Sequence, residues 1–130
     1  KTIVGNTSRK LSLRLDNDKL SSRKQRQGIA PNFVHSLDAA ALIRTVNRAY
    51  DYGVRDFAMI HDSYGTTASQ ASVLAKALRE SYAEMFSEPI LERFREDVCS
   101  LLEDSSAVPP VPSKGDMSPD EVLKSTYFFS

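Results

Sequence analysis

Residues 57–66 read Phe57-Ala58-Met59-Ile60-His61-Asp62-Ser63-Tyr64-Gly65-Thr66, and this stretch decides the fold. Its first four residues form a short apolar run bounded by turn residues, which predicts a buried strand. The polar triplet His61-Asp62-Ser63 then favours a tight turn, because Asp and Ser readily bond to backbone amides in turns. Residues 64–67 can return as a second strand. The stretch therefore predicts a β-hairpin with a carboxylate at its tip.

Three helices are predicted around this hairpin. Pro31 and Asn32 are expected to open the first, which ends at about Tyr52 because Gly53 suits a left-handed C-cap. The second covers about residues 69–86, and the third runs from Ser87-Glu88-Pro89 to about residue 103. Their apolar residues fall on helical stripes that can face a core. The expected inner residues are Val34, Leu42, Val46 and Ala49 beside Phe33 and Ile43, then Val73, Leu74, Ala77, Leu78, Tyr82 and Met85, then Ile90, Leu91, Phe94, Val98, Leu101 and Leu102.

The outer segments are less regular. Residues 2–4 and 11–15 are predicted to be short strands, and residues 16–27 are predicted to be a polar, basic loop. Residues 105–112 are expected to run across the surface without regular secondary structure. Ser118 is expected to start a last short helix. The aromatic ending implies a docked chain end, since exposed ends are normally polar and frayed. We therefore expect an α+β fold: a small antiparallel hairpin packed by three main helices, with a docked aromatic C-terminal tail. A basic segment over residues 1–27 would precede one structural unit over residues 28–130.

Length and composition are typical of one soluble globular domain. The 130 residues are 41% hydrophobic and 26% charged, and no apolar run approaches the roughly 18–20 residues of a membrane helix. No signal peptide is visible. Because the first residue is Lys1 rather than Met, we expect a fragment of a longer protein. The single Cys99 excludes an internal disulfide, fits a reducing compartment and is interpreted as a small buried filler.

Charge is distributed unevenly, although the formal net charge is zero. Residues 1–48 carry ten Lys/Arg against three Asp/Glu, while residues 49–130 carry seven against fourteen. The asymmetry indicates one basic surface that can contact phosphate groups and one acidic surface on another side of the protein. A solvated basic loop would give the same pattern, so both interpretations stay open.

Asp62 has the clearest potential for chemistry. A carboxylate at a hairpin tip, directly after a buried strand, is fixed rigidly and projects into a cleft. Such a group suits Mg²⁺, which usually binds through one or two carboxylates plus substrate phosphates. Two-metal phosphoryl transfer needs two such carboxylates. The alternative is that Asp62 only satisfies the amides of its own turn.

Three landmarks follow one another along the chain. They are Pro31-Asn32-Phe33-Val34-His35-Ser36-Leu37-Asp38, then Ile60-His61-Asp62-Ser63-Tyr64-Gly65-Thr66, then Lys114-Gly115-Asp116 with the ending Ser125-Thr126-Tyr127-Phe128-Phe129-Ser130. In this order they closely resemble the bacteriophage and mitochondrial single-subunit DNA-directed RNA polymerases, over most of residues 28–130. The His-Asp pair alone is not specific, whereas the combination is.

The resemblance implies roles for individual residues. Asp62 matches the palm-domain metal ligand of the third polymerase motif, and His61 matches its companion beside the primer terminus. His35 matches the histidine that approaches the newest base pair near the ribose. Purely structural roles remain the alternatives, for His61 as a core histidine behind the hairpin and for His35 as an early-helix residue bonded to backbone.

The aromatic ending resembles the family's terminal foot, which packs close to the active site. Tyr127 and Phe129 occupy its alternating aromatic positions, although simple anchoring would also explain them. Gly65 resembles the phage branch, whereas residues 87–91 and the Tyr-Phe-Phe-Ser ending resemble the mitochondrial branch. We favour the phage branch and hence the cytoplasm of a phage-infected bacterium, with the mitochondrial matrix as the alternative.

The basic stretch ahead of His35 could contact template or hybrid phosphates, a sequence-independent contribution. It contains no aromatic residue on which bases could stack. Its basic residues are Arg9, Lys10, Arg14, Lys19, Arg23, Lys24 and Arg26.

The implied reaction is attack of an RNA 3′-hydroxyl on the α-phosphate of a ribonucleoside triphosphate, assisted by two Mg²⁺ ions. The implied partners are the DNA template, the RNA transcript, the nucleotides and the rest of the polymerase chain, with no membrane. The family's second carboxylate and its nucleotide-binding fingers helix would lie upstream, and Asp16, Asp18 and Asp56 do not replace that carboxylate. We therefore predict that the isolated chain is inactive.

Three alternatives remain at this stage. The palm of a family A DNA polymerase also has a His-Asp hairpin, but a glutamate normally follows where this chain has Ser63. An HD-type phosphohydrolase would need more metal-binding histidines than His35 and His61. A non-enzymatic interaction module derived from a polymerase is the third.

Overall fold

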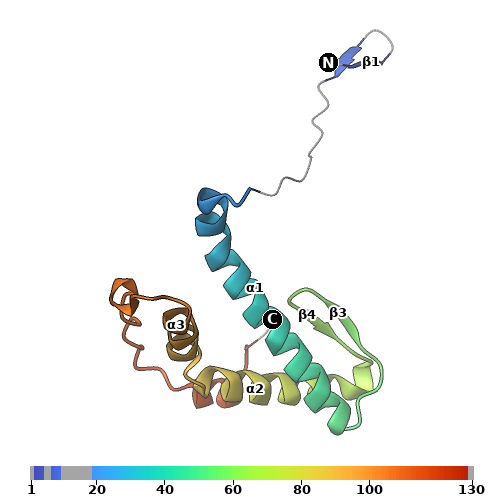
Figure 1. The fold of residues 1–130 in the computed structure, drawn as a ribbon. Helices are drawn as coiled ribbons and strands as arrows, with labels where there is room; N and C mark the ends of the chain where they lie inside the picture. The colour runs from blue at the N-terminus through green and yellow to red at the C-terminus, as the bar shows by residue number, and fades with distance from the viewer. Residues whose placement is uncertain (1, 5–6, 10–18, 129–130) are drawn as a thin grey trace. The chain divides into compact units, whose positions relative to one another are not determined.

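The computed structural model describes the backbone of residues 2–4, 7–9 and 19–128, and side chains over residues 19–128. The chain divides into two compact units, Lys1–Asn32 and Phe33–Ser130. Three main helices and antiparallel two-stranded hairpins form the described part (Figure 1), which confirms the predicted fold class. No helix among the described residues is long and apolar enough to cross a membrane.

The first unit holds a small hairpin and the start of helix α1. Strand β1 (Thr2–Val4) pairs antiparallel with β2 (Thr7–Arg9), so that Ile3 lies opposite Ser8. The strand that we predicted over residues 11–15 lies outside the described residues. Helix α1 spans Ser22–Asp51, and its first turns belong to this unit.

The predicted start of α1 at Pro31 was wrong, because the helix begins at Ser22. The loop predicted over residues 16–27 was therefore wrong from Ser22 onward. The Ser21 hydroxyl accepts from the Lys24 amide at 3.4 Å, and the Ser21 carbonyl accepts from the Gln25 amide at 3.0 Å. These contacts make Ser21 an N-cap, which starts the helix earlier. Pro31 lies inside α1, where proline lacks one helical hydrogen bond without ending the helix here.

The end of α1 confirms the prediction made from Gly53. Gly53 has φ of 98°, its amide donates to the Tyr50 carbonyl at 3.0 Å, and the Val54 amide donates to the Ala49 carbonyl at 3.0 Å. This pair of hydrogen bonds is a Schellman motif, which needs a left-handed residue after the last helical turn. It returns the chain toward the core, where Val54 and Ala49 are buried.

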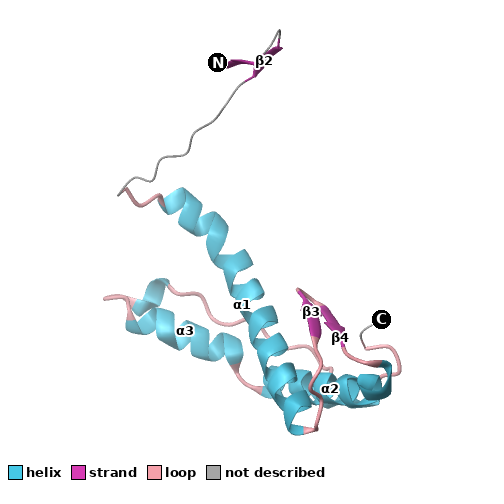
Figure 2. Ribbon diagram, turned by 90° about the vertical axis from the view of Figure 1, so that its right-hand side faces the viewer, coloured by secondary structure: helices cyan, strands magenta, loops and turns pink. Residues whose placement is uncertain are grey.

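A second antiparallel hairpin follows α1. Strand β3 (Ala58–Ile60) pairs with β4 (Ser63–Gly65), with Met59 opposite Tyr64. Both of these side chains pack against a core of Ala49, Val54, Leu74 and Ala77. Figure 1 and Figure 2 show that this hairpin and helix α3 lie on opposite sides of the C-terminal half of α1.

The two remaining helices complete the second unit. The turn η1 (Ala68–Gln70) leads into α2 (Ala71–Ser87), and α3 (Ile90–Ser100) follows after Pro89. Leu74, Ala77, Leu78 and Met85 of α2 are buried, as predicted. The turns η2 (Ser105–Ala107) and η3 (Pro119–Lys124) come after α3, and the Ser118 hydroxyl caps η3.

Several predicted burials were wrong. Strand β3 is not a buried strand, because Ile60 is 76% exposed and Ala58 is exposed as well. A two-stranded hairpin can cover only one of its faces against this core, so alternate residues face outward. The predicted inner residues Val34 and Ile43 of α1, and Leu91, Leu101 and Leu102 in or just after α3, are also exposed. Helix α3 ends at Ser100 rather than near residue 103.

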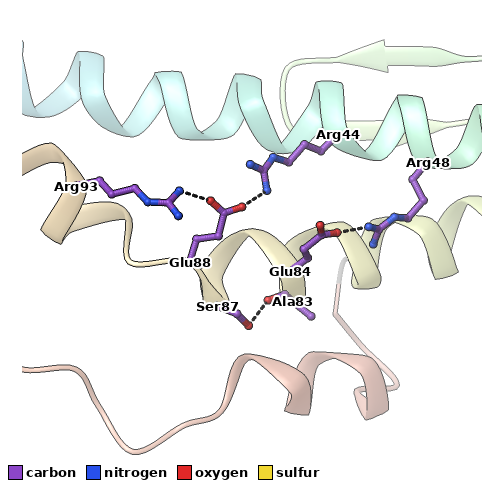
Figure 3. Close-up of polar contacts among 7 residues, drawn as sticks. All are labelled: Arg44, Arg48, Ala83, Glu84, Ser87, Glu88 and Arg93. Carbon is purple, nitrogen blue, oxygen red and sulfur yellow. Dashed lines mark hydrogen bonds and ion pairs between the residues drawn. The ribbon is translucent and has the colours of Figure 1, made fainter.

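Ion pairs join the three helices at one junction (Figure 3). Glu88, which follows α2, accepts from Arg44 of α1 at 2.7 Å and from Arg93 of α3 at 2.7 Å. Arg48 of α1 pairs with Glu84 of α2 one turn further along. The guanidinium groups of Arg44 and Arg93 lower the pKa of the Glu88 carboxyl. The junction joins α1, α2 and α3 through charge, beside the buried Ala41 of α1 and Met85 of α2.

Candidate functional site

The turn between β3 and β4 contains only His61 and Asp62. Ile60 pairs with Ser63, so two residues close the hairpin. His61 has φ of 58°, a left-handed conformation that non-glycine residues rarely adopt. Two-residue hairpin turns require positive φ at their first position, and glycine or asparagine usually stands there. The conformation fixes the backbone of the turn, and both side chains are exposed at its tip.

The base of the hairpin is tied to the rest of the unit. A Cβ on Gly65 would lie 3.0 Å from the Ala58 carbonyl oxygen, so the two strands can pair this closely only with glycine there. The Thr66 hydroxyl donates to the Asp56 carbonyl at 2.7 Å across the two ends of the hairpin. These contacts hold the turn in a fixed register.

His35 of α1 lies against the tip of the hairpin. Its ring meets the His61 ring edge to face, with 6.1 Å between centroids and 81° between planes. Nearby, the Phe33 ring packs on Phe94 of α3, with centroids 4.5 Å apart. Two histidines that are far apart in sequence are thus brought together beside Asp62.

A pocket of about 750 Å³ opens beside the hairpin. Asp62 and Ser63 from the hairpin, Arg79 from α2 and Phe128 contribute side chains with different chemistry. Its remaining lining residues are Tyr64, Gly65, Thr66, Ala71, Leu74, Ala75 and Leu78. The pocket therefore combines one carboxylate, hydroxyls, one guanidinium and an apolar floor from α2.

Tyrosines link the hairpin to α2 behind this pocket. Burial raises the pKa of the Tyr64 hydroxyl, and its hydrogen bond with Tyr82 and the nearby charges of Asp38 and Asp62 raise it further. The Tyr82 ring also meets Phe128 edge to face, with centroids 5.2 Å apart. Tyr64 is therefore a partly buried packing and hydrogen-bonding group.

The donor set at the turn fits part of a magnesium site. Asp62 offers an exposed carboxylate at a fixed turn, which suits a hard cation that also takes oxygen ligands from water and substrate phosphates. Over residues 19–128, no group of three or more His, Cys, Asp or Glu side chains is arranged to hold a metal ion. Asp62 is thus a single candidate ligand rather than a complete site.

The predicted site residues fall into different places. Asp62, His61 and His35 come together, whereas the Tyr127 side chain is 83% exposed and does not line the pocket. Arg23, Lys24 and Arg26 are exposed on the first turns of α1. The side chains of Arg9, Lys10, Arg14 and Phe129 lie outside the described part of the structure.

Two lining residues were missed by sequence reasoning. Arg79 was not singled out, and Phe128 was named only as part of the aromatic ending. The spacing of Arg79 and Tyr82 on one face of α2 was the available signal, since residues three apart in a helix are neighbours. What those residues face could be found only from the fold.

Comparisons with known proteins agree with this geometry. The model of the family described as DNA-dependent RNA polymerase matches residues 3–108. DNA-directed RNA polymerase 1A of Nicotiana tabacum is 40% identical over 120 residues, which cover 92% of this chain and 76% of that protein. The mitochondrial DNA-directed RNA polymerase 1 of Arabidopsis thaliana is 38% identical over 128 residues, which cover 98% of this chain.

A phage enzyme matches as well. The DNA-directed RNA polymerase of Enterobacteria phage T3 is 38% identical over 115 residues, which cover 85% of this chain. The chain spans only 13% of the length of the Arabidopsis and T3 proteins. Because the family model covers most of its length and relatives from plants and a phage match alike, the chain belongs to the family of single-subunit DNA-directed RNA polymerases.

Proposed function

We propose that this chain supplies one half of the catalytic metal site of a DNA-directed RNA polymerase. The reaction would be nucleotidyl transfer from ribonucleoside triphosphates to an RNA 3′ end, directed by a DNA template. The observation that carries the proposal is the arrangement at the β3–β4 turn. There, a family carboxylate, Asp62, lies at a fixed hairpin tip beside two histidines and a pocket of about 750 Å³.

Asp62 is proposed as the Mg²⁺ ligand. When bound, the metal would stabilise the charge that develops during phosphoryl transfer. The protein's contribution is to hold the carboxylate in place, which the two-residue turn and the close approach of Gly65 to Ala58 support. The second carboxylate would come from another part of the polymerase, so the isolated 130 residues should not synthesise RNA.

His61 and His35 are proposed to position the RNA end and the newest base pair. Their edge-to-face contact gives each imidazole a defined place next to Asp62. Imidazole nitrogens can donate to or accept from ribose hydroxyls, which suits a position beside the primer terminus. Tyr127 and Phe129 remain candidates for the terminal foot, as the sequence predicts.

The basic residues at the start of α1 are proposed to contact nucleic-acid phosphates. Arg23 and Arg26 are three apart and therefore neighbours on one helical face, and both are exposed. A helix holds its charges in a fixed array, whereas the loop that we had predicted would not. Such contacts would weaken steeply with added salt.

Relatives from a phage and from plants match at 38–40% identity, and the Arabidopsis relative is a mitochondrial polymerase. We retain the phage-infected bacterial cytoplasm as the proposed location, with the mitochondrial matrix as the alternative. Purification of the native polymerase from phage-infected bacteria or from mitochondria would decide between these two locations.

The test is RNA extension by the polymerase that contains this chain, on a DNA template with a bound RNA primer and Mg²⁺. Asp62→Asn keeps the size of the side chain and removes its charge. We expect the rate of nucleotide addition to fall by at least about 100-fold, as for the loss of a major transition-state stabiliser. Asp56→Asn is the matched control, because Asp56 lies at the base of the same hairpin and contributes its carbonyl to Thr66.

The two variants separate the possible outcomes. The proposal is supported if Asp62→Asn is inactive while Asp56→Asn extends RNA like the wild type. It is overturned if Asp62→Asn keeps wild-type activity, or if the isolated 130-residue chain extends RNA without the rest of the polymerase. An interaction module without catalytic function would give wild-type rates for both variants.

A further inference from the structure

Arg79 is a pocket residue to which the proposed function gives no role. It lies on α2, is half-buried and lines the same pocket as Asp62. Its Nε donates to the Ser125 carbonyl at 3.2 Å, and its Nη1 donates to the Ala75 carbonyl at 3.0 Å. Among residues 19–128, Arg79 takes part in none of the ion pairs. This cation is therefore held by carbonyl oxygens from two separate segments.

The Ser125 carbonyl marks the end of the turn η3. The Ser125 amide donates to the Val122 carbonyl at 3.2 Å, which closes that turn. A cation beside the last carbonyls of a helical turn is stabilising, because those groups lack partners within the turn. Arg79 thus binds residues 119–125 to α2 at the point where the chain leaves η3 for Phe128.

Phe128 continues this line of contacts to the hairpin. Its ring packs edge to face on Tyr82, one turn along α2 from Arg79, at an interplanar angle of 78°. Tyr82 in turn forms a hydrogen bond with Tyr64 of β4. Tyr64 is separated from Asp62 by Ser63 alone, and all three residues line the pocket. A displacement of residues 125–128 would therefore reach strand β4, which directly follows Asp62.

We propose that Arg79 is a positioning residue for catalysis. By fixing Ser125 on α2, it holds Phe128 against Tyr82, and Tyr82 holds Tyr64 and the Asp62 turn in place. The inference rests on the proposed function of Asp62. It predicts that the loss of Arg79 lowers the rate of the chemical step more than the affinity for nucleotide, because Arg79 acts on the geometry of the turn. Misplacing a reacting group by about 1 Å can reduce the rate by about 100-fold.

The test compares Arg79→Gln with Arg79→Lys and with a matched control in the complete polymerase. Glutamine removes the charge and cannot reach both carbonyls, while lysine keeps the charge with a single donor group. The control is Arg95→Gln on α3, since Arg95 donates to the Pro109 carbonyl at 3.0 Å and to the Val108 carbonyl at 3.4 Å. Arg95 thus forms the same kind of arginine–carbonyl anchor outside the pocket.

Two readouts are needed. Primer extension gives kcat and KM for the ribonucleotide, and limited trypsin digestion reports cleavage after Lys124, next to the Ser125 anchor. We expect Arg79→Gln to lower kcat at least about tenfold with KM changed less than about twofold, the pattern of an interaction needed only in the transition state. Cleavage after Lys124 should become faster. Arg79→Lys should show a smaller change of both readouts, and Arg95→Gln should show neither change.

Each outcome bears on one proposal. Wild-type kcat in Arg79→Gln, or an equal loss of kcat in Arg95→Gln, overturns the role of Arg79. If Arg79→Gln lowers the melting temperature, its loss of kcat can arise from a folding defect, and Arg79→Lys is then the deciding variant. A lowered kcat of Arg79→Lys at the wild-type melting temperature supports the positioning role. A wild-type kcat of Arg79→Lys overturns it. Failure of the proposed function is distinguishable, because Asp62→Asn would then be active. An inactive Asp62→Asn with a fully active Arg79→Gln rejects the inference about Arg79 alone.

Discussion

His61 shows how a single residue departs from local preference at the hairpin tip. Its φ of 58° lies in a region that costs a non-glycine residue roughly 1–2 kcal/mol. Glycine would adopt this conformation without that strain, and the turn type favours glycine. Residues held in such conformations cluster at functional sites. The positive φ of His61 and its ring pair with His35 therefore make this residue the one to test for the proposed role in the site.

Two small residues in place of His61 separate the effect of its imidazole from that of its backbone conformation. His61→Gly and His61→Ala both remove the imidazole, so both should slow RNA extension. They should differ in stability, because only glycine relieves the positive φ. We expect the glycine variant to be more stable than the alanine variant by about 1 kcal/mol, measured by denaturant unfolding. Equal stabilities would show that the turn is unstrained, and undiminished extension by both would remove the imidazole from the mechanism.

Helix α1 has one glycine inside it and another just beyond its C-terminal end, in opposite situations. Gly53 ends the helix with φ of 98°, and a Cβ at this position would have no atom within 4 Å, so the backbone conformation alone requires glycine. Gly28 lies inside the helix, where a Cβ would meet the Asn32 side chain at an ordinary 3.6 Å. One glycine forms the cap, whereas the other only weakens the helix.

Alanine substitutions should therefore have opposite signs. Gly53→Ala should destabilise the protein by about 1 kcal/mol, because alanine is strained in the left-handed region. Gly28→Ala should stabilise α1 by up to about 1 kcal/mol, because alanine loses less backbone entropy in a helix. Thermal unfolding of the two variants checks this pair. A stabilised Gly53→Ala would contradict the capping role of Gly53.

The same helix illustrates what could be predicted from the sequence. Gly53 was predicted as the C-cap because the requirement is local to a few backbone bonds. The start was missed because Pro31 carries a strong local signal for a first turn, while the Ser21 cap gives a weaker one. For the site, the family motif predicted His35 and Asp62 together. Arg79 was not predicted, because its hydrogen-bond partner, Ser125, lies 46 residues further along the sequence.

Burial was the least predictable property at the scale of the whole molecule. The apolar run around Ile60 resembles a buried strand, yet burial depends on what covers each face, and the described residues cover only one. Exposed apolar residues such as Ile60 and Leu101 accordingly lie outside the core formed by α1, α2 and the hairpin. Charged side chains also join the helices outside that core, through the Glu88 junction of α1, α2 and α3.

This junction should make stability depend on pH. The pKa of Glu88 is lowered in the folded state, first by its hydrogen bond to Arg44 and then by the charges and the second bond from Arg93. A carboxyl with a lowered folded pKa contributes stability above its unfolded pKa and loses it as pH falls through the folded pKa. Glu88→Gln should therefore lower the melting temperature at neutral pH, with a difference that shrinks as the pH drops below the ordinary range for glutamate. Added salt should also reduce the difference, because the three side chains are partly exposed.

Glu96→Gln provides the matched control for the pH experiment. Glu96 is an exposed glutamate of the same helix as Arg93, and it takes part in none of the ion pairs among residues 19–128. Its replacement should leave the melting temperature close to that of the wild type at every pH. If Glu88→Gln behaves like Glu96→Gln at neutral pH and low salt, the ion pairs do not hold the three helices together. If its difference instead persists unchanged at acidic pH, the contribution of Glu88 arises from packing rather than from its charge.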